Sequence, residues 1–98
     1  IQMELITVGM AGSVESNDIN IIIEPTENPG IQIDLQSAVM KRFGRQIREL
    51  IEKTLREEGV ENAVVKAVDK GAVDFVIKAR TLTALYRAAG KKEYNWGE

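Results

Sequence analysis

The chain has 98 residues, of which 44% are hydrophobic and 29% charged, a composition typical of a folded globular domain. A domain of this size buries only about 60–65% of the surface that its unfolded chain exposes, so a deep enclosed active site is not expected. The sequence contains neither cysteine nor histidine, which excludes disulfides and cysteine nucleophiles and argues against zinc sites. With no secretory segment and no apolar run of membrane-spanning length, we expect a cytoplasmic protein without a membrane partner.

Charge is distributed unevenly along the chain. Residues 1–40 contain six acidic residues and no basic one, whereas residues 41–98 contain nine acidic and thirteen basic residues. An acidic surface around the N-terminal segment would repel phosphate backbones and attract basic partners. Acids placed on strands and loops for solubility would explain the same pattern equally well.

The first elements along the chain are predicted to be two strands. Residues 1 and 2 precede Met3, a natural start position, so we expect the domain to begin at Met3. Ile19, Ile21 and Ile23 alternate with Asn20, Ile22 and Glu24, as in a strand that can be buried on both faces, and apolar and polar residues alternate over 31–36, as in a half-buried strand. The turn residues Asn28-Pro29-Gly30 separate the two segments, which we therefore predict to form a hairpin.

A long amphipathic helix is predicted to follow. Ser37 is suited to cap its N-terminus, and Gly59 is a stop signal. Between them, apolar residues recur at spacings of three and four, which indicates one buried helix face. The residues that we expect to pack against the sheet include Phe43, Ile47, Leu50 and Ile51.

Two more strands and a shorter helix complete the prediction. Residues 63–68 and 72–77 read as strands joined by Asp69-Lys70-Gly71, a turn that places its glycine at positive φ. Residues 79–89 read as a second helix. The predicted order is ββαββα, an α+β two-layer sandwich with a mostly antiparallel sheet. We expect a single domain over residues 3–90 and a C-terminal tail over 91–98.

The segment A-G-S-V-E-S-N-D-I at residues 11–19 concentrates small, hydroxyl and acidic residues. A serine hydroxyl is a weak nucleophile without a neighbouring base, so Ser13 and Ser16 cannot form a hydrolytic centre by themselves. They could be modified by another enzyme that brings its own base. A plain turn would have the same composition, because Ser, Asn and Asp are common turn residues.

Residues 11–16, followed by Asp18 and an aliphatic strand, resemble the prosthetic-group attachment segment of the citrate lyase acyl carrier protein (γ subunit) family. Further matches follow in the order of that family across nearly the whole chain. They are Phe43-Gly44, Asp69 to Ala72, Ala79-Arg80, Arg87 to Ala89 and Trp96.

The resemblance implies a non-catalytic acyl carrier subunit. In that family a 2'-(5''-phosphoribosyl)-3'-dephospho-coenzyme A group is attached to a serine, which corresponds to Ser16, with Ser13 as the second candidate. The thiol of this arm would carry acetyl and citryl thioesters between the transferase (α) and lyase (β) subunits while citrate is cleaved to acetate and oxaloacetate. A holo-carrier synthase would attach the arm. Candidate docking residues for these partners are Glu15, Asp18 and Trp96.

Two alternatives remain open from the sequence. The carrier subunit of malonate decarboxylase uses the same kind of arm on a comparable serine. A small α+β nucleic-acid-binding module is suggested by the basic helix start over 41–48, but it requires exposed strand aromatics, and Phe75 is flanked like a core residue. Pairs at i and i+4 explain the basic residues as a salt-bridged helix face, namely Arg45–Glu49, Arg48–Glu52 and Glu52–Arg56.

Overall fold

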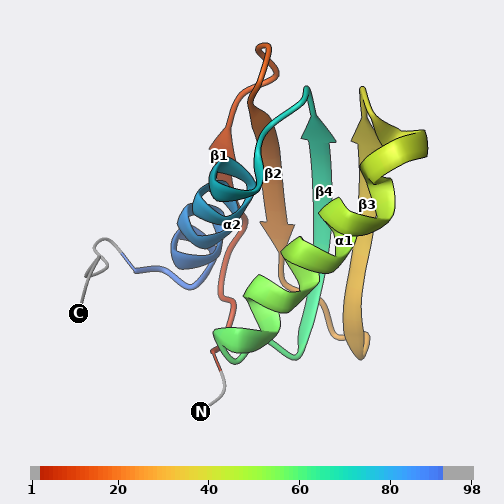
Figure 1. Ribbon diagram of the computed structural model, residues 1–98. Helices are drawn as coiled ribbons and strands as arrows, with labels where there is room; N and C mark the ends of the chain where they lie inside the picture. The colour runs from red at the N-terminus through yellow and green to blue at the C-terminus, as the bar shows by residue number, and fades with distance from the viewer. Residues whose placement is uncertain (1–2, 92–98) are drawn as a thin grey trace.

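A computed structural model describes residues 3–91 and shows one four-stranded sheet with both helices on the same face (Figure 1). The strand order in the sheet is β1-β2-β4-β3. The elements are β1 Gly9–Gly12, β2 Ile19–Glu24, β3 Gly30–Ser37, α1 Met40–Glu57, β4 Asn62–Asp69 and α2 Asp74–Ala88.

The predicted fold class is confirmed, but the predicted strand pairing is wrong. β2 pairs antiparallel with β1 and β4, whereas β3 pairs parallel with β4. Strands β2 and β3 therefore do not form a hairpin, because β4 lies between them. Parallel neighbours require a crossover connection, and α1 supplies it between β3 and β4. Alternation of residues along a strand indicates its buried face but not its neighbour.

The order of elements is βββαβα instead of ββαββα. Residues 72–77 do not form a strand; α2 begins at Asp74, inside this segment. Its β-branched and aromatic residues favour a strand locally, but an acid in the first helical turn and buried positions at helical spacing favour the helix. The additional strand is the short β1, whose two glycines among four residues carry little strand signal.

The core lies between the helices and one face of the sheet. Alternate residues of β2 and β4 are fully buried, and register places Ile21 opposite Ala67 and Ile23 opposite Val65. The short β1 contacts α2 closely at Gly9, where a Cβ would lie 2.1 Å from the carbonyl oxygen of Ala84. Only glycine permits this backbone approach.

The buried face of α1 agrees with the prediction in part. Ile47 and Ile51 are buried and Leu50 is half-buried against the core, but Phe43 is 41% exposed, which corrects its predicted position on the sheet. Ser37 is not the N-cap: it is the last residue of β3, and α1 is capped at Val39 without a side-chain bond. The predicted stop at Gly59 is confirmed by its φ of 87°.

The difference in burial between neighbouring residues of α1 predicts a difference in stability. Ile51→Ala should lower the free energy of unfolding by about 2–5 kcal/mol, because it leaves a cavity in a fully buried site. Leu50→Ala should cost less, since this side chain already contacts water. Urea unfolding followed by circular dichroism measures both values, and an equal or larger loss for Leu50→Ala would contradict the assigned helix face.

Candidate functional site

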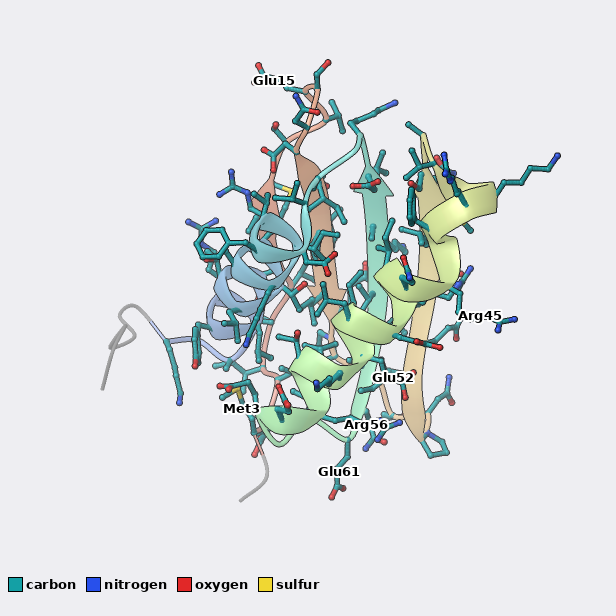
Figure 2. The ribbon with its side chains drawn as sticks, in the orientation of Figure 1. Met3, Glu15, Arg45, Glu52, Arg56 and Glu61 are labelled. Carbon is teal, nitrogen blue, oxygen red and sulfur yellow. The ribbon has the colours of Figure 1, made fainter. Side chains whose placement is uncertain are left out.

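The loop over residues 13–18 connects β1 to β2 at one end of the sheet (Figure 1). Glu15 lies at the tip of this loop and points away from the domain (Figure 2). The loop begins after Gly12, which has a φ of 89° and would place a Cβ 1.8 Å from the carbonyl oxygen of Ile19. The start of the loop therefore requires glycine.

Ser16 occupies the second position of a tight turn. The turn is closed by Asp18, whose amide donates to the carbonyl of Glu15 at 3.2 Å, and Asn17 has a φ of 67°. A positive φ at the third turn position is typical of type II turns and is well tolerated by asparagine. Ser16 is exposed, and within residues 3–91 its hydroxyl has no hydrogen-bond partner. A second protein can reach this hydroxyl directly.

Ser13 has a different environment. Its hydroxyl donates to Oδ2 of Asp18 at 2.7 Å and accepts a hydrogen bond from the amide of Glu15 at 3.2 Å. Modification of this oxygen would remove its proton and so break the hydrogen bond to Asp18. The two serines therefore differ: the hydroxyl of Ser13 helps to fix the loop, and the hydroxyl of Ser16 is exposed and unbonded among the described residues.

The carboxylate of Asp18 holds the base of the loop. Besides Ser13, it accepts hydrogen bonds from the amide of Ile19 at 2.7 Å and from Nε of Arg80 at 3.0 Å. Arg80 belongs to α2 and forms an ion pair with Asp18 across 62 positions of sequence. Asp18 is thus occupied by internal contacts, so of the two acids among the three predicted docking residues only Glu15 is freely exposed.

The hydrogen bond from Arg80 is the main reason why the pKa of Asp18 is lowered from 3.8 to about 2. Partial burial acts in the opposite direction, while the bonds from Ser13 and the amide of Ile19 also lower the pKa. The sequence places Arg80 in a motif but gives no signal of this contact, because the pairing depends on how α2 packs beside β1.

A backbone bridge ties the loop to the segment after β4. The amide of Asn17 donates to the carbonyl of Lys70 at 2.8 Å, and the amide of Lys70 donates to the carbonyl of Asp18 at 2.9 Å. The predicted positive φ at Gly71 is confirmed at 93°, but the turn leads into α2 and not into another strand. The loop is thereby held on both sides while its tip remains free.

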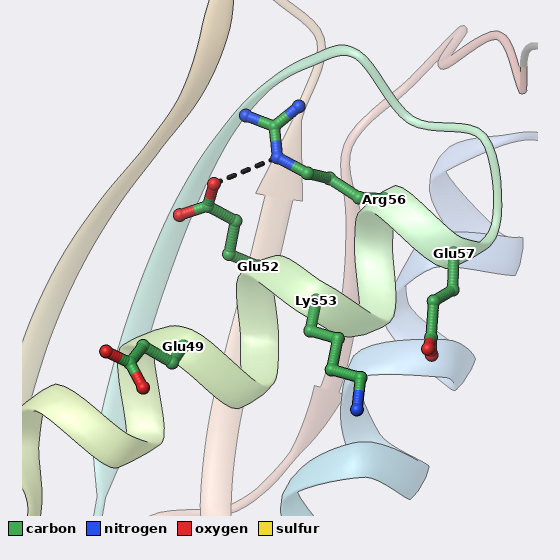
Figure 3. A pocket seen from close by; sticks show the side chains of 5 residues that line it. All are labelled: Glu49, Glu52, Lys53, Arg56 and Glu57. Atoms are coloured by element: carbon green, nitrogen blue, oxygen red, sulfur yellow. Dashed lines mark hydrogen bonds and ion pairs between the residues drawn. The ribbon is translucent and has the colours of Figure 1, made fainter.

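The charged face of α1 offers no comparable site. A shallow hollow on its outer side is lined by residues of this one helix, and the side chains project from it without an opposing wall (Figure 3). The lining residues are Glu49, Glu52, Lys53, Arg56 and Glu57. Of the predicted i,i+4 pairs, Glu52–Arg56 is present at 2.9 Å, whereas Arg48 instead donates to the carbonyl of Ile33. This surface is a solvated helix face.

Other predicted features fall outside the site or change position. Trp96 lies beyond the residues that the structure describes. Phe75 is on α2 and 81% exposed, which corrects its predicted place in a strand and in the core. Over residues 3–91 no helix is long and apolar enough to cross a membrane, and no group of three potential metal ligands is found.

The ion pair predicts a measurable effect of pH. A lowered folded-state pKa stabilises the fold above about pH 4, and this contribution is lost as the pH falls toward 2; it amounts to roughly 2 kcal/mol at most. Arg80→Met should raise the pKa of Asp18 toward 4 in a carboxyl NMR titration. It should also remove stability at neutral pH but not near pH 2.

The matched control is Lys78→Met on the same helix, which leaves the Asp18 contacts intact. A wild-type Asp18 that titrates near pH 4, or an equal effect of both variants, would show that the ion pair contributes nothing.

Comparisons with known proteins agree with this geometry. Residues 7–88 match the protein family described as "ACP: Malonate decarboxylase delta subunit (MdcD)". The chain is 52% identical to the citrate lyase acyl carrier protein of Streptococcus uberis over 96 residues, covering 98% of this chain and 94% of the relative. It is 51% identical to that of Fusobacterium nucleatum over 94 residues, covering 96% of this chain and all of the relative.

The fold also occurs in a solved structure of a Pseudomonas malonate decarboxylase hetero-tetramer in complex with malonate. The similarity has a TM-score of 0.67 at 21% identity and covers 84% of each chain, so it supports the fold alone. The relatives at about half identity are citrate lyase acyl carrier proteins. On the strength of these relatives, the chain belongs to the citrate lyase acyl carrier protein family.

Proposed function

We propose that the chain is the carrier subunit of a citrate lyase and that Ser16 bears its prosthetic arm. The observation that supports this most directly is the exposed Ser16 hydroxyl, unbonded among the described residues, in a loop whose base is fixed by Asp18 and Lys70. A synthase that binds a loop of fixed shape does not have to order it first, which lowers the entropic cost of recognition.

The proposed arm is 2'-(5''-phosphoribosyl)-3'-dephospho-coenzyme A, attached through a phosphodiester. The oxygen of Ser16 would bond to the first phosphorus of a triphosphoribosyl precursor, pyrophosphate would leave, and a base of the synthase would take the proton. The chain itself offers no histidine for this step. The exposed serine fits such a group, because nothing in the turn has to move to admit it.

The arm, when bound, supplies the thiol on which acetyl and citryl groups travel between a transferase (α) and a lyase (β) subunit. The chain has no cysteine of its own that could hold a thioester. Its own contribution is to anchor the arm and to keep it near both partners at high effective concentration. The absence of cysteine also agrees with a cytoplasmic place for such a complex.

The surface that meets these partners is proposed to include Glu15 at the loop tip. Its carboxylate is exposed and points outward, so a basic surface on the synthase or on a catalytic subunit can approach it (Figure 2). Asp18 would act indirectly by holding the turn, and Trp96 remains a candidate anchor in the tail.

A malonate decarboxylase carrier is the second candidate, favoured by the description of the matching family. The identity of about one half to citrate lyase carriers, against 21% to a chain of the malonate decarboxylase structure, favours citrate lyase. Mass spectrometry of the native protein would distinguish the two: a citryl group would indicate citrate lyase and a malonyl group malonate decarboxylase, whereas an acetyl group is expected of both, since decarboxylation of a malonyl thioester leaves an acetyl thioester.

The attachment residue can be tested by co-expression with a holo-carrier synthase and its triphosphoribosyl precursor. Intact-mass measurement should show one added prosthetic group on the wild-type chain and on Ser13→Ala, and none on Ser16→Ala. Thermal unfolding of both variants controls for misfolding. A group gained by Ser16→Ala but lost by Ser13→Ala would move the attachment to Ser13.

A second test concerns catalysis. The purified chain without its arm should not cleave citrate, because it has neither the thiol nor a histidine base for carbon–carbon bond cleavage. Oxaloacetate release, coupled to malate dehydrogenase, measures this activity. Turnover that scales with the concentration of the isolated chain would contradict the carrier function.

A further inference from the structure

We propose that a cleft between α1 and α2 binds the adenine base of the arm. The cleft has a volume of about 270 Å³ and lies at the N-terminal ends of both helices. These helix ends and the loop over 13–18 are at the same end of the sheet (Figure 1). The inference rests on the proposed function, since it concerns the group attached to Ser16.

The cleft is within reach of the attachment residue. Gly71 lines the cleft and directly follows Lys70 in the chain. The carbonyl oxygen of Lys70 accepts a hydrogen bond from the amide of Asn17 at 2.8 Å. With standard backbone bond lengths, this path limits the separation of the Cα atoms of Ser16 and Gly71 to about 10 Å. A Cβ at Gly71 would lie 3.7 Å from the side-chain oxygen of Asn17, so the loop and the cleft share a border.

The lining has the chemistry that a purine requires. Phe43 and Ile47 from α1 and Ala72 and Ile77 from the α2 side supply the apolar part of the lining, and polar groups supply about as much of its surface. Gln46 and Asp74 add an amide and a carboxylate. A side-chain amide can both donate a hydrogen bond to the edge of adenine and accept one from it, and a carboxylate can accept a hydrogen bond from the adenine amino group. An aromatic ring can stack on the face of the base.

The size of the cleft selects one part of the arm. Sites for drug-sized ligands have volumes of about 300–1,000 Å³, so a cleft of about 270 Å³ accommodates a single base and not the whole arm. By the arm's chemical name, the phosphoribosyl unit is joined directly to the adenosine. The adenine is therefore the first flat, largely apolar group beyond the Ser16 linkage.

The charges near the cleft favour an anionic nucleotide. The first turn of α1 contains no acid, and Lys41 and Arg42 are exposed there. The guanidinium of Arg42 lies over the ring of Phe43, 5.6 Å from its centroid, which places a cation beside the proposed base. Lys70 adds another exposed cation between the loop and the cleft, while Asp74 is the only acid that lines the cleft within the described residues. These cations would attract the phosphates of the arm.

Docking of the base would define how the arm moves. With the adenosine held beside Gly71, the pantetheine part would swing from the cleft and not from Ser16. The shorter free tether would confine the thiol to a smaller volume and raise its effective concentration at partner sites that it can still reach.

The test uses the loaded protein, with loading confirmed by intact mass. Nuclear Overhauser effects should connect the adenine H2 or H8 protons to the ring of Phe43, and loading should shift the amide signals of Ala72 and Ile77. Gln46→Leu should remove both signals, and Phe43→Ala should remove the loading-dependent shifts of Ala72 and Ile77. Phe75→Ala is the matched control, because it removes an exposed helix aromatic that does not line the cleft.

Two negative results have different meanings. A wild-type chain that gains no mass overturns the proposed function together with this inference. A chain that gains the full mass, yet shows no adenine contacts and shifts only within residues 13–18, overturns the base-binding cleft alone. Equal loss of the signals in Phe75→Ala would likewise show that the contacts are not made in the cleft.

Discussion

The buried carboxylate of Asp69 holds together the end of the domain at which the loop over 13–18 lies. It accepts hydrogen bonds from the hydroxyl of Ser37 and from the amides of Gly71 and Ala72 at 2.8–3.1 Å. Burying a carboxylate is costly unless it is hydrogen-bonded, and these three bonds offset that cost. They join the end of β3 and the entry into α2 at the end of β4. Lys70 then extends the same end to the loop that carries Ser16.

Some polar residues of the loop over 13–18 stabilise its shape, while Ser16 is left exposed. Ser13 and Asp18 use their side-chain oxygens internally, and Gly12 supplies a backbone conformation that other residues rarely adopt. Because these contacts fix the base, the exposed turn does not need bonds from Ser16 to keep its shape. A hydroxyl without an internal partner can be modified with no loss of folding energy. This separation explains why two serines only three positions apart are not equivalent.

The positions of most strands and turns could be predicted from the sequence, whereas the pairing of strands and the contacts between distant segments could not. Alternation located β2, β3 and β4, and glycines marked the end of α1 and the turn before α2, because these signals depend on residues close in the chain. The pairing of β3 with β4 and the contact of Arg80 with Asp18 depend on packing between distant segments. The prediction of a strand over 72–77 was wrong because tertiary packing of α2 overrides the strand propensity of these residues. The sequence singled out Ser16 as a candidate through its neighbouring residues, but only the structure shows that its hydroxyl is unbonded among the described residues.

Two of the six acids among the first forty residues are neutralised by bases from the second part of the chain. Asp18 is paired with Arg80, and Glu24 is paired with Lys66 at 3.4 Å. The other four, Glu4, Glu15, Glu27 and Asp34, are exposed. What remains beside Ser16 is one free acid, Glu15, with Lys70 behind it. In the proposed carrier, a basic partner would be attracted to the loop tip, while the phosphates of the arm would be attracted back toward the domain. The net charge of a segment therefore says less about docking than the position of the few charges that stay unpaired.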